Sequence, residues 1–175
     1  MSCDISRGRL EPCKDSVGGL NAVYFVNKGD LGAITYDVTD TDVIDAVAGT
    51  PSAYKFDIKG ASTYTENITS SRENGTTTFE QVLELQLTKL TKEDHKTVKL
   101  LAFGSPTILV EDNNGNVFVA GLEHGLDVSG GTIVSGASMG DMSGYTLTFS
   151  GMEKAPANFL GDTISAVGFS VTEGV

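Results

Sequence analysis

Few side chains in this sequence are of the types that catalyse reactions or bind metals. One of its two histidines, His124, lies between two carboxylates, Glu123 and Asp127. Imidazole nitrogen and carboxylate oxygen are donors that divalent metals accept. Because neighbours along a chain point in different directions and rarely converge on one ion, we expect residues 122–127 to form a structural loop without a metal.

Two further groups imitate metal sites without matching one. Cys3 and Cys13 have a spacing that fits no zinc site, so we expect free thiols, with a disulfide or an intersubunit contact as the alternatives. A run of aspartates resembles part of a calcium loop, but the required glycine and closing glutamate are missing (Asp37, Asp40, Asp42 and Asp45). We interpret that run as a solvated turn.

Catalytic motifs are missing as well. Gly-x-Ser-x-Gly does not occur, and no glycine-rich loop carries the lysine of a phosphate-binding loop. The 23 carboxylates leave a pair of glycosidase acids open, but the chain has no Trp to form a platform for sugars. The sequence therefore predicts a protein that is not an enzyme and that uses no cofactor or metal.

Composition and charge narrow the class further. A chain of 175 residues with 39% hydrophobic residues can bury a core as one domain. Its formal charge of −11 argues against a nucleic-acid-binding face. The charge is uneven, since residues 105–175 contain 8 acidic residues and a single Lys or Arg, Lys154. We expect no membrane span and, since charged residues follow Met1, no cleaved leader.

The most regular pattern lies between residues 78 and 88. Phe79, Leu83, Leu85 and Leu87 share one parity, which is typical of a half-buried strand, and Gln81 and Val82 are the exceptions to the pattern. The opposite parity places five polar residues on the other face (Thr78, Glu80, Glu84, Gln86 and Thr88).

A helix is predicted next, near residues 92–103. Thr91 is a suitable N-cap for the backbone N–H of Asp94, and Gly104 and Pro106 end the helix. An apolar stripe at helical spacing is expected to pack on the sheet, with His95 on the exposed face (Val98, Leu101 and Ala102).

The remaining chain is predicted to form short strands and turns. Asn74-Gly75 and Asn114-Gly115 indicate two hairpins, and the glycine-rich residues 121–144 indicate an ordered, bulged β-region, a flexible linker being the alternative. Residues 164–171 are expected to form the last strand. The prediction is a mainly β protein: an antiparallel β-sandwich or barrel with one short α-helix packed against it, made of an N-terminal arm (residues 1–20) and a single domain (residues 21–175).

This order of elements resembles the tail tube proteins of bacteriophages and of related contractile injection machines. The resemblance depends on residues 60–75, on the helix start Leu90-Thr91-Lys92-Glu93-Asp94, and on residues 136–151, which include Gly140-Asp141-Met142-Ser143-Gly144. It implies a virion structural protein in the phage tail, assembled in the host bacterial cytoplasm. It also implies homo-oligomeric six-fold rings that stack into a tube, contacts with other tail proteins, and passage of DNA without specific binding. Residues 1–20 and 37–52 are the candidates for contacts between rings.

In such a tube the polar face of the 78–88 strand is the expected lining of the lumen, with Glu80, Glu84, Gln86 and Thr78 as candidate residues, because acidic side chains repel DNA phosphates. The alternatives are another virion piece, such as a capsid decoration or tail-completion protein, and an acidic adhesin or carbohydrate-binding module.

Overall fold

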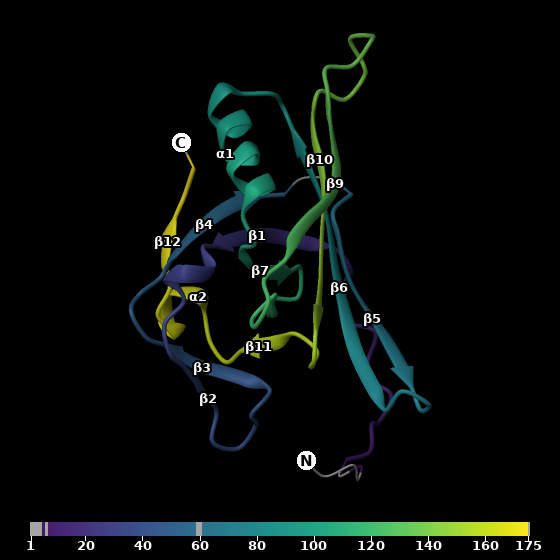
Figure 1. Cartoon of the computed structure of the whole chain (residues 1–175), viewed down its shortest axis with the longest axis vertical. Coiled ribbons are helices and arrows are strands. Elements are labelled where there is room, and N and C mark those ends of the chain that lie inside the picture. Colours follow the sequence, from purple (N-terminus) through teal and green to yellow (C-terminus); the bar gives the residue numbers. More distant parts are fainter. Residues whose placement is uncertain (1–4, 6, 59–60, 175) are drawn as a thin grey trace.

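The protein is mainly β and is built from two sheets and one longer helix (Figure 1). The computed structural model describes residue 5, residues 7–58 and residues 61–174. The strands are β1 Leu20–Val26, β2 Ile34–Tyr36, β3 Val43–Val47, β4 Ser52–Asp57, β5 Thr63–Ser71, β6 Thr76–Thr88, β7 Thr107–Asp112, β8 Val117–Ala120, β9 Asp127–Val134, β10 Gly144–Glu153, β11 Asn158–Leu160 and β12 Ser170–Thr172. The helices are α1 Lys92–Phe103, the short α2 Ile164–Val167 and the 3-10 turn η1 Lys28–Asp30.

The two sheets have different sizes and face one another as a β-sandwich. The larger sheet has the order β12-β4-β1-β7-β8-β11-β3-β2, and the smaller has the order β5-β6-β10-β9. All pairs in the smaller sheet are antiparallel, whereas β11 with β3 and β12 with β4 are parallel. The predicted fold class is confirmed, with these two parallel pairs as an addition to the antiparallel scheme.

Strand β1 is buried on both of its faces. Val23 and Phe25 lie in the core between the two sheets, with Leu83 and Phe149 of the smaller sheet. Its alternate residues lie in a second core on the other side of the larger sheet, where β3 and α2 also contribute (Ala22, Tyr24, Val26, Ile44, Val47, Ile164 and Val167). This double burial explains why β1 is a continuous apolar run rather than an alternating one.

Helix α1 has the predicted bounds and caps. The Thr91 hydroxyl accepts the N–H of Asp94 at 3.0 Å, and the N–H of Gly104 donates to the carbonyls of Leu100 and Leu101. Val98 is buried in the core between the sheets and Leu101 packs against that core.

The prediction for Ala102 was wrong, since this residue is exposed. The face of α1 that contacts the sheet includes Asp94 and Thr97, both half-buried, beside Val98 and Leu101. At 100° per residue this contact face is centred between Val98 and Leu101 on the side away from Ala102. His95 is exposed, as expected.

Both predicted hairpins are present. The β5–β6 turn spans residues 72–75 and the β7–β8 turn includes Gly115, with positive φ at Gly75 (64°) and Gly115 (84°). In the second turn the Asp112 carboxylate accepts the N–H groups of Asn114 and Asn116 at 2.9 and 2.8 Å. The glycine-rich residues after β8 are ordered and include β9, whose pairing with β10 has a register shift. The flexible-linker alternative is therefore rejected.

The predicted last strand is only partly present. Ile164 and Val167 belong to the single turn α2, and Gly168, at φ 118°, ends it before β12. The two apolar residues are three positions apart and point together into the second core, which favours a helical turn over a strand.

The segments expected to contact other rings differ in structure. Residues 7–18 are exposed and belong to no helix or strand. Near their end, the side-chain oxygen of Asn114 accepts the N–H of Val17 at 2.9 Å, and the Asn114 amide donates to the carbonyl of Val17 at 2.8 Å. Residues 37–52 include β3, with Ile44 buried.

The Asp37 carboxylate accepts the N–H groups of Thr39 and Asp40, and these hydrogen bonds lower its pKa. Asp37, Asp40 and Asp42 lie in the predicted turn, whereas the prediction was wrong for Asp45, which is an exposed residue of β3.

Candidate functional site

The small sheet has a polar outer face that belongs to neither core. On β6, alternation places Thr78, Glu80, Glu84 and Gln86 on this face, and Leu83 and Leu85 on the buried one. The register with β5 sets Thr63 opposite Glu84 and Asn67 opposite Glu80. The neighbouring strands contribute further short polar side chains to the same face (Thr65, Thr69, Thr132, Thr146, Thr148 and Ser150).

The charge on this face is of one sign. Glu80 is half-buried and Glu84 is exposed, and the Asn67 amide donates to the Glu80 carboxylate at 3.5 Å. Strands β5, β6, β9 and β10 contain no Lys or Arg at all. The face therefore repels anions and has no basic side chain with which to bind a phosphate.

The two exceptions in the β6 pattern have separate outcomes. Gln81 lies on the buried face, 1% exposed, where its side-chain oxygen accepts the N–H of Gly121 at 2.8 Å. Val82 lies on the outer face, between Thr65 of β5 and Ser150 of β10. The strict alternation of the strand is thus kept, and a hydrogen bond compensates the buried amide.

Both edges of the small sheet are open. Among the described residues, strand β5, of 9 residues, pairs only with β6, and β9, of 8 residues, pairs only with β10. Neither strand contains Pro or Lys, the residues that commonly protect an edge from pairing with another chain. In Figure 1 the β9–β10 hairpin extends beyond the body at one end, and the β5–β6 hairpin extends towards the other end.

The loop around His124 is organised by a residue that the sequence did not indicate. Glu153, at the end of β10 and 6% exposed, accepts the N–H groups of Glu123 and His124 through Oε1 at 3.2 and 2.8 Å. Its Oε2 lies 3.0 Å from Nδ1 of His124. Asp127, which the sequence grouped with His124, instead accepts the hydroxyl of Ser105. Residues 122–126 lie in a loop between β8 and β9, whereas Asp127 is the first residue of β9. Glu153 was missed because its partners lie far away in the sequence.

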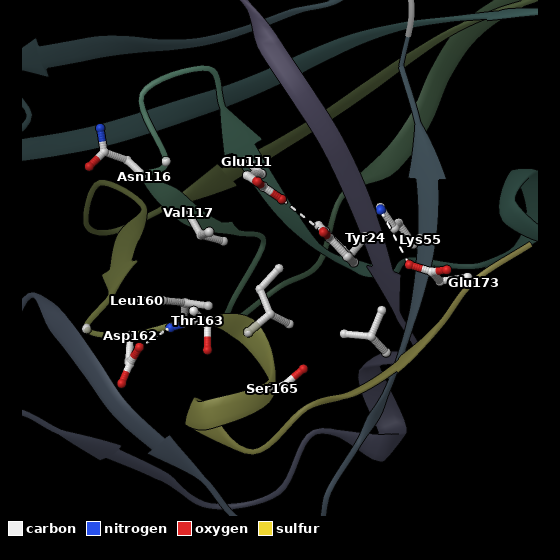
Figure 2. Close-up of a pocket in the computed structure, with 14 residues that line it drawn as sticks. Tyr24, Lys55, Glu111, Asn116, Val117, Leu160, Asp162, Thr163, Ser165 and Glu173 are labelled. Atoms are coloured by element: carbon white, nitrogen blue, oxygen red, sulfur yellow. Dashed lines mark hydrogen bonds and ion pairs between the residues drawn. The ribbon is translucent and has the colours of Figure 1, made fainter. Parts of the chain in front are cut away.

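A cavity of about 680 Å³ opens on the second-core side of the large sheet (Figure 2). The Tyr24 hydroxyl donates to Glu111 at 2.9 Å, and the pKa of Tyr24 is raised above its ordinary value by burial first and then by this carboxylate. Lys55 lies 3.5 Å from Glu173 at one side of the cavity. The residues that line the cavity include no His or Cys, and its polar side chains include Tyr24, Glu111 and Ser165.

Comparisons of the chain with protein-family models, with curated proteins and with solved structures found no match. Among the described residues, no helix combines the length and the apolar character needed to cross a membrane.

Proposed function

We propose that this chain is a virion structural protein that assembles into stacked rings and forms the tail tube of a bacteriophage. The observation that carries the proposal is the small sheet, which combines a polar outer face with two edge strands that have no further strand partner among the described residues. The chain has no catalytic role in this proposal and uses no cofactor or metal for it.

Open edges supply the means of assembly. Pairing of β5 of one copy with β9 of the next copy would satisfy the free backbone groups of both strands and would continue the sheet from subunit to subunit. A repeated contact of this heterologous kind closes into a ring when its rotation allows it. The resulting ring of sheets is a barrel whose two faces differ, because the period of two separates polar from apolar side chains.

The outer face of the small sheet has the properties of a channel lining. It carries Glu80 and Glu84 together with uncharged side chains that include Gln86 and Thr78. The apolar side chains of the same strands are needed in the core of each subunit, so the polar face is the one left for water and DNA. Carboxylates there keep DNA mobile, since they offer phosphates no site of attraction.

The partners follow from this arrangement. Copies of the chain would form six-fold rings in the virion tail, other tail proteins would close the ends of the tube, and DNA would pass without specific binding. Assembly would take place in the cytoplasm of the host bacterium, and no membrane is involved.

Negative-stain microscopy and native mass measurement of the purified protein test the proposal. We expect long polymers with a central channel, built from rings of one size. Discrete small oligomers without a channel would contradict the tube and would favour a capsid decoration or tail-completion protein. A stable monomer at high concentration would also contradict it.

A further inference from the structure

We propose that Glu123, His124 and Glu153 form a binding site for one divalent transition-metal ion, with Zn²⁺ as the best match. The site lies where the loop after β8 meets the end of β10, away from the polar face of the small sheet. The inference is independent of the proposed tube, since it concerns the folded single chain.

The donor set and its geometry support this assignment. One ligand atom from each of the three residues lies within 4.8 Å of the others, and His124 Nδ1 is 3.0 Å from Glu153 Oε2. Ligand atoms around a tetrahedral Zn²⁺ are about 3.4 Å apart, given metal–ligand distances near 2.1 Å. Two of the ligands are therefore already near their metal-bound separation. The exposed side chain of Glu123 has to rotate, and the imidazole has to carry its proton on Nε2 so that Nδ1, which now shares a hydrogen bond with Glu153, is free to bind the ion. A water molecule would complete the four ligands.

Charge is the second argument. Glu123 and Glu153 place two carboxylates in one small site, and Glu153 is 6% exposed. Among the described residues no Lys or Arg forms an ion pair with Glu153, and Lys154 contacts only the outer carboxylate, Glu123, at 3.7 Å. A bound dication would supply the missing positive charge at a buried carboxylate.

The site is also held in place before any ion binds. The backbone N–H groups of Glu123 and His124 both donate to Glu153 Oε1, and Oε2 is directed at the imidazole. Gly121 and Gly125 have positive φ, and a Cβ at Gly125 would lie 2.5 Å from the carbonyl oxygen of Ser105. The backbone at Gly125 therefore packs closely against Ser105, and a side chain at this position would displace the loop.

One nitrogen and two carboxylate donors select among metals. Zn²⁺ accepts this mixed set with an open fourth position, whereas Ca²⁺ requires six to eight oxygen ligands and Mg²⁺ an octahedron of oxygens. We therefore expect Zn²⁺ to bind and Ca²⁺ to have no effect at the same concentration.

The test uses the full chain without an affinity tag and with both cysteines replaced (Cys3→Ser and Cys13→Ser), so that thiols cannot bind the metal. Isothermal titration with Zn²⁺ and thermal unfolding with and without Zn²⁺ are measured on this parent, on His124→Ala, on Glu123→Gln and on His95→Ala. The last variant is the matched control, because His95 is an exposed histidine on α1. Co²⁺ is added as a spectroscopic substitute for Zn²⁺.

We expect the parent and His95→Ala to bind one equivalent of Zn²⁺, to unfold at a higher temperature with it, and to give visible Co²⁺ absorption. His124→Ala and Glu123→Gln should each weaken Zn²⁺ binding at least about 10-fold, the loss caused even by removing an outer partner of a metal ligand. Equal binding by the parent and His124→Ala would overturn the proposal. An unfolding temperature of the parent that does not change with Zn²⁺ would overturn it too. Glu153 would then serve only to hold the loop through its hydrogen bonds to Glu123 and His124. Neither result affects the proposed tube, which microscopy tests separately.

Discussion

Gln81 shows how a single buried amide connects strands that are distant in sequence. It is a polar side chain among leucines on the buried face of β6, and its oxygen accepts the N–H of Gly121 at 2.8 Å. Gly121 in turn accepts a hydrogen bond from Gly125 N–H and begins the loop that Glu153 holds. A substitution at Gln81 should therefore also disturb the hydrogen bonds of Glu153 at the end of β10.

Replacement of Gln81 by Leu should lower the free energy of unfolding by about 1–3 kcal/mol. The cost arises because the buried N–H of Gly121 then has no acceptor. Urea denaturation of Gln81→Leu measures it. Glu84→Gln, on the exposed face of the same strand, is the control and should change stability by less than about 0.5 kcal/mol. An unchanged denaturation midpoint for Gln81→Leu would show that the hydrogen bond is not needed.

For individual residues, the sequence predicted the face of β6 on which each side chain lies. It did not predict the hydrogen-bond partners of the polar residues. Parity depends only on neighbours two positions apart, so it is visible in one strand. The acceptor role of Gln81 and the position of Glu153 depend on contacts between residues about 30 to 40 positions apart, and no local pattern encodes those contacts. The available signal was that Gln81, a polar residue, has the same parity as the buried leucines of β6, which indicates that its side chain needs a hydrogen-bond partner in the core.

At the scale of elements, α1 is stabilised by its caps and by a narrow apolar contact. Leu101 packs against the core between the sheets, whereas its neighbour Leu100 is 64% exposed. The two leucines form a matched pair within one helix, because the same substitution removes the same atoms from different environments.

Leu101→Ala should lower the free energy of unfolding by about 1–3 kcal/mol, less than the 2–5 kcal/mol of a fully buried leucine, because Leu101 is only half-buried. Leu100→Ala should stay within about 0.5 kcal/mol of the wild type. Thermal or urea unfolding of both variants checks the difference. Equal losses would mean that the contact face of α1 is assigned wrongly.

The elements differed in how well the sequence predicted them. The helix α1 was predicted because its caps, stripe and terminator agree with one another. The single turn α2 was missed although Ile164, Val167 and Gly168 carry its pattern, because so short a helix is stable only through packing in the second core. Ala102 was misplaced because helical spacing defines a stripe but not which edge of it meets the sheet.

At the scale of the whole molecule, the N-terminal segment should matter for assembly and not for folding. Residues 7–18 are exposed, and their contact with the body is at the base, where Asn114 holds Val17 and the Asn113 amide donates to the carbonyl of Gly18. An extended segment with so few contacts is ordered more readily by a neighbouring copy.

Deletion of residues 2–17 should leave the melting temperature nearly unchanged but prevent elongation into tubes. Analytical ultracentrifugation and microscopy measure this. The double variant Asn113→Ala with Asn114→Ala keeps the segment but releases its base, and it should give shorter tubes. Tubes of normal length from the truncated chain would refute the role of the segment.

Replacement of both Glu80 and Glu84 by Lys should leave folding nearly intact, because both side chains lie on the outer face of the small sheet. In the assembled tube the lysines would attract phosphates, so DNA should be retained at low salt and released at high salt. Filter binding of DNA to assembled tubes across a salt series measures the effect, with the double Gln variant as the control. An absence of DNA retention by the Lys variant would argue that this face does not line the channel.

The double burial of β1 has a consequence for how the molecule opens. Val23 and Phe25 pack in the core between the sheets, and Tyr24 and Val26 pack in the second core. Neither core can therefore become exposed to solvent while β1 stays paired with its neighbouring strands. The two cores should thus unfold in one cooperative step, and the amide hydrogens of β1 and β7 should exchange with solvent only during that step. The outward amides of β5 and β9 have no such protection in a single subunit, so their exchange rates in hydrogen–deuterium experiments would report directly on whether neighbouring subunits have joined.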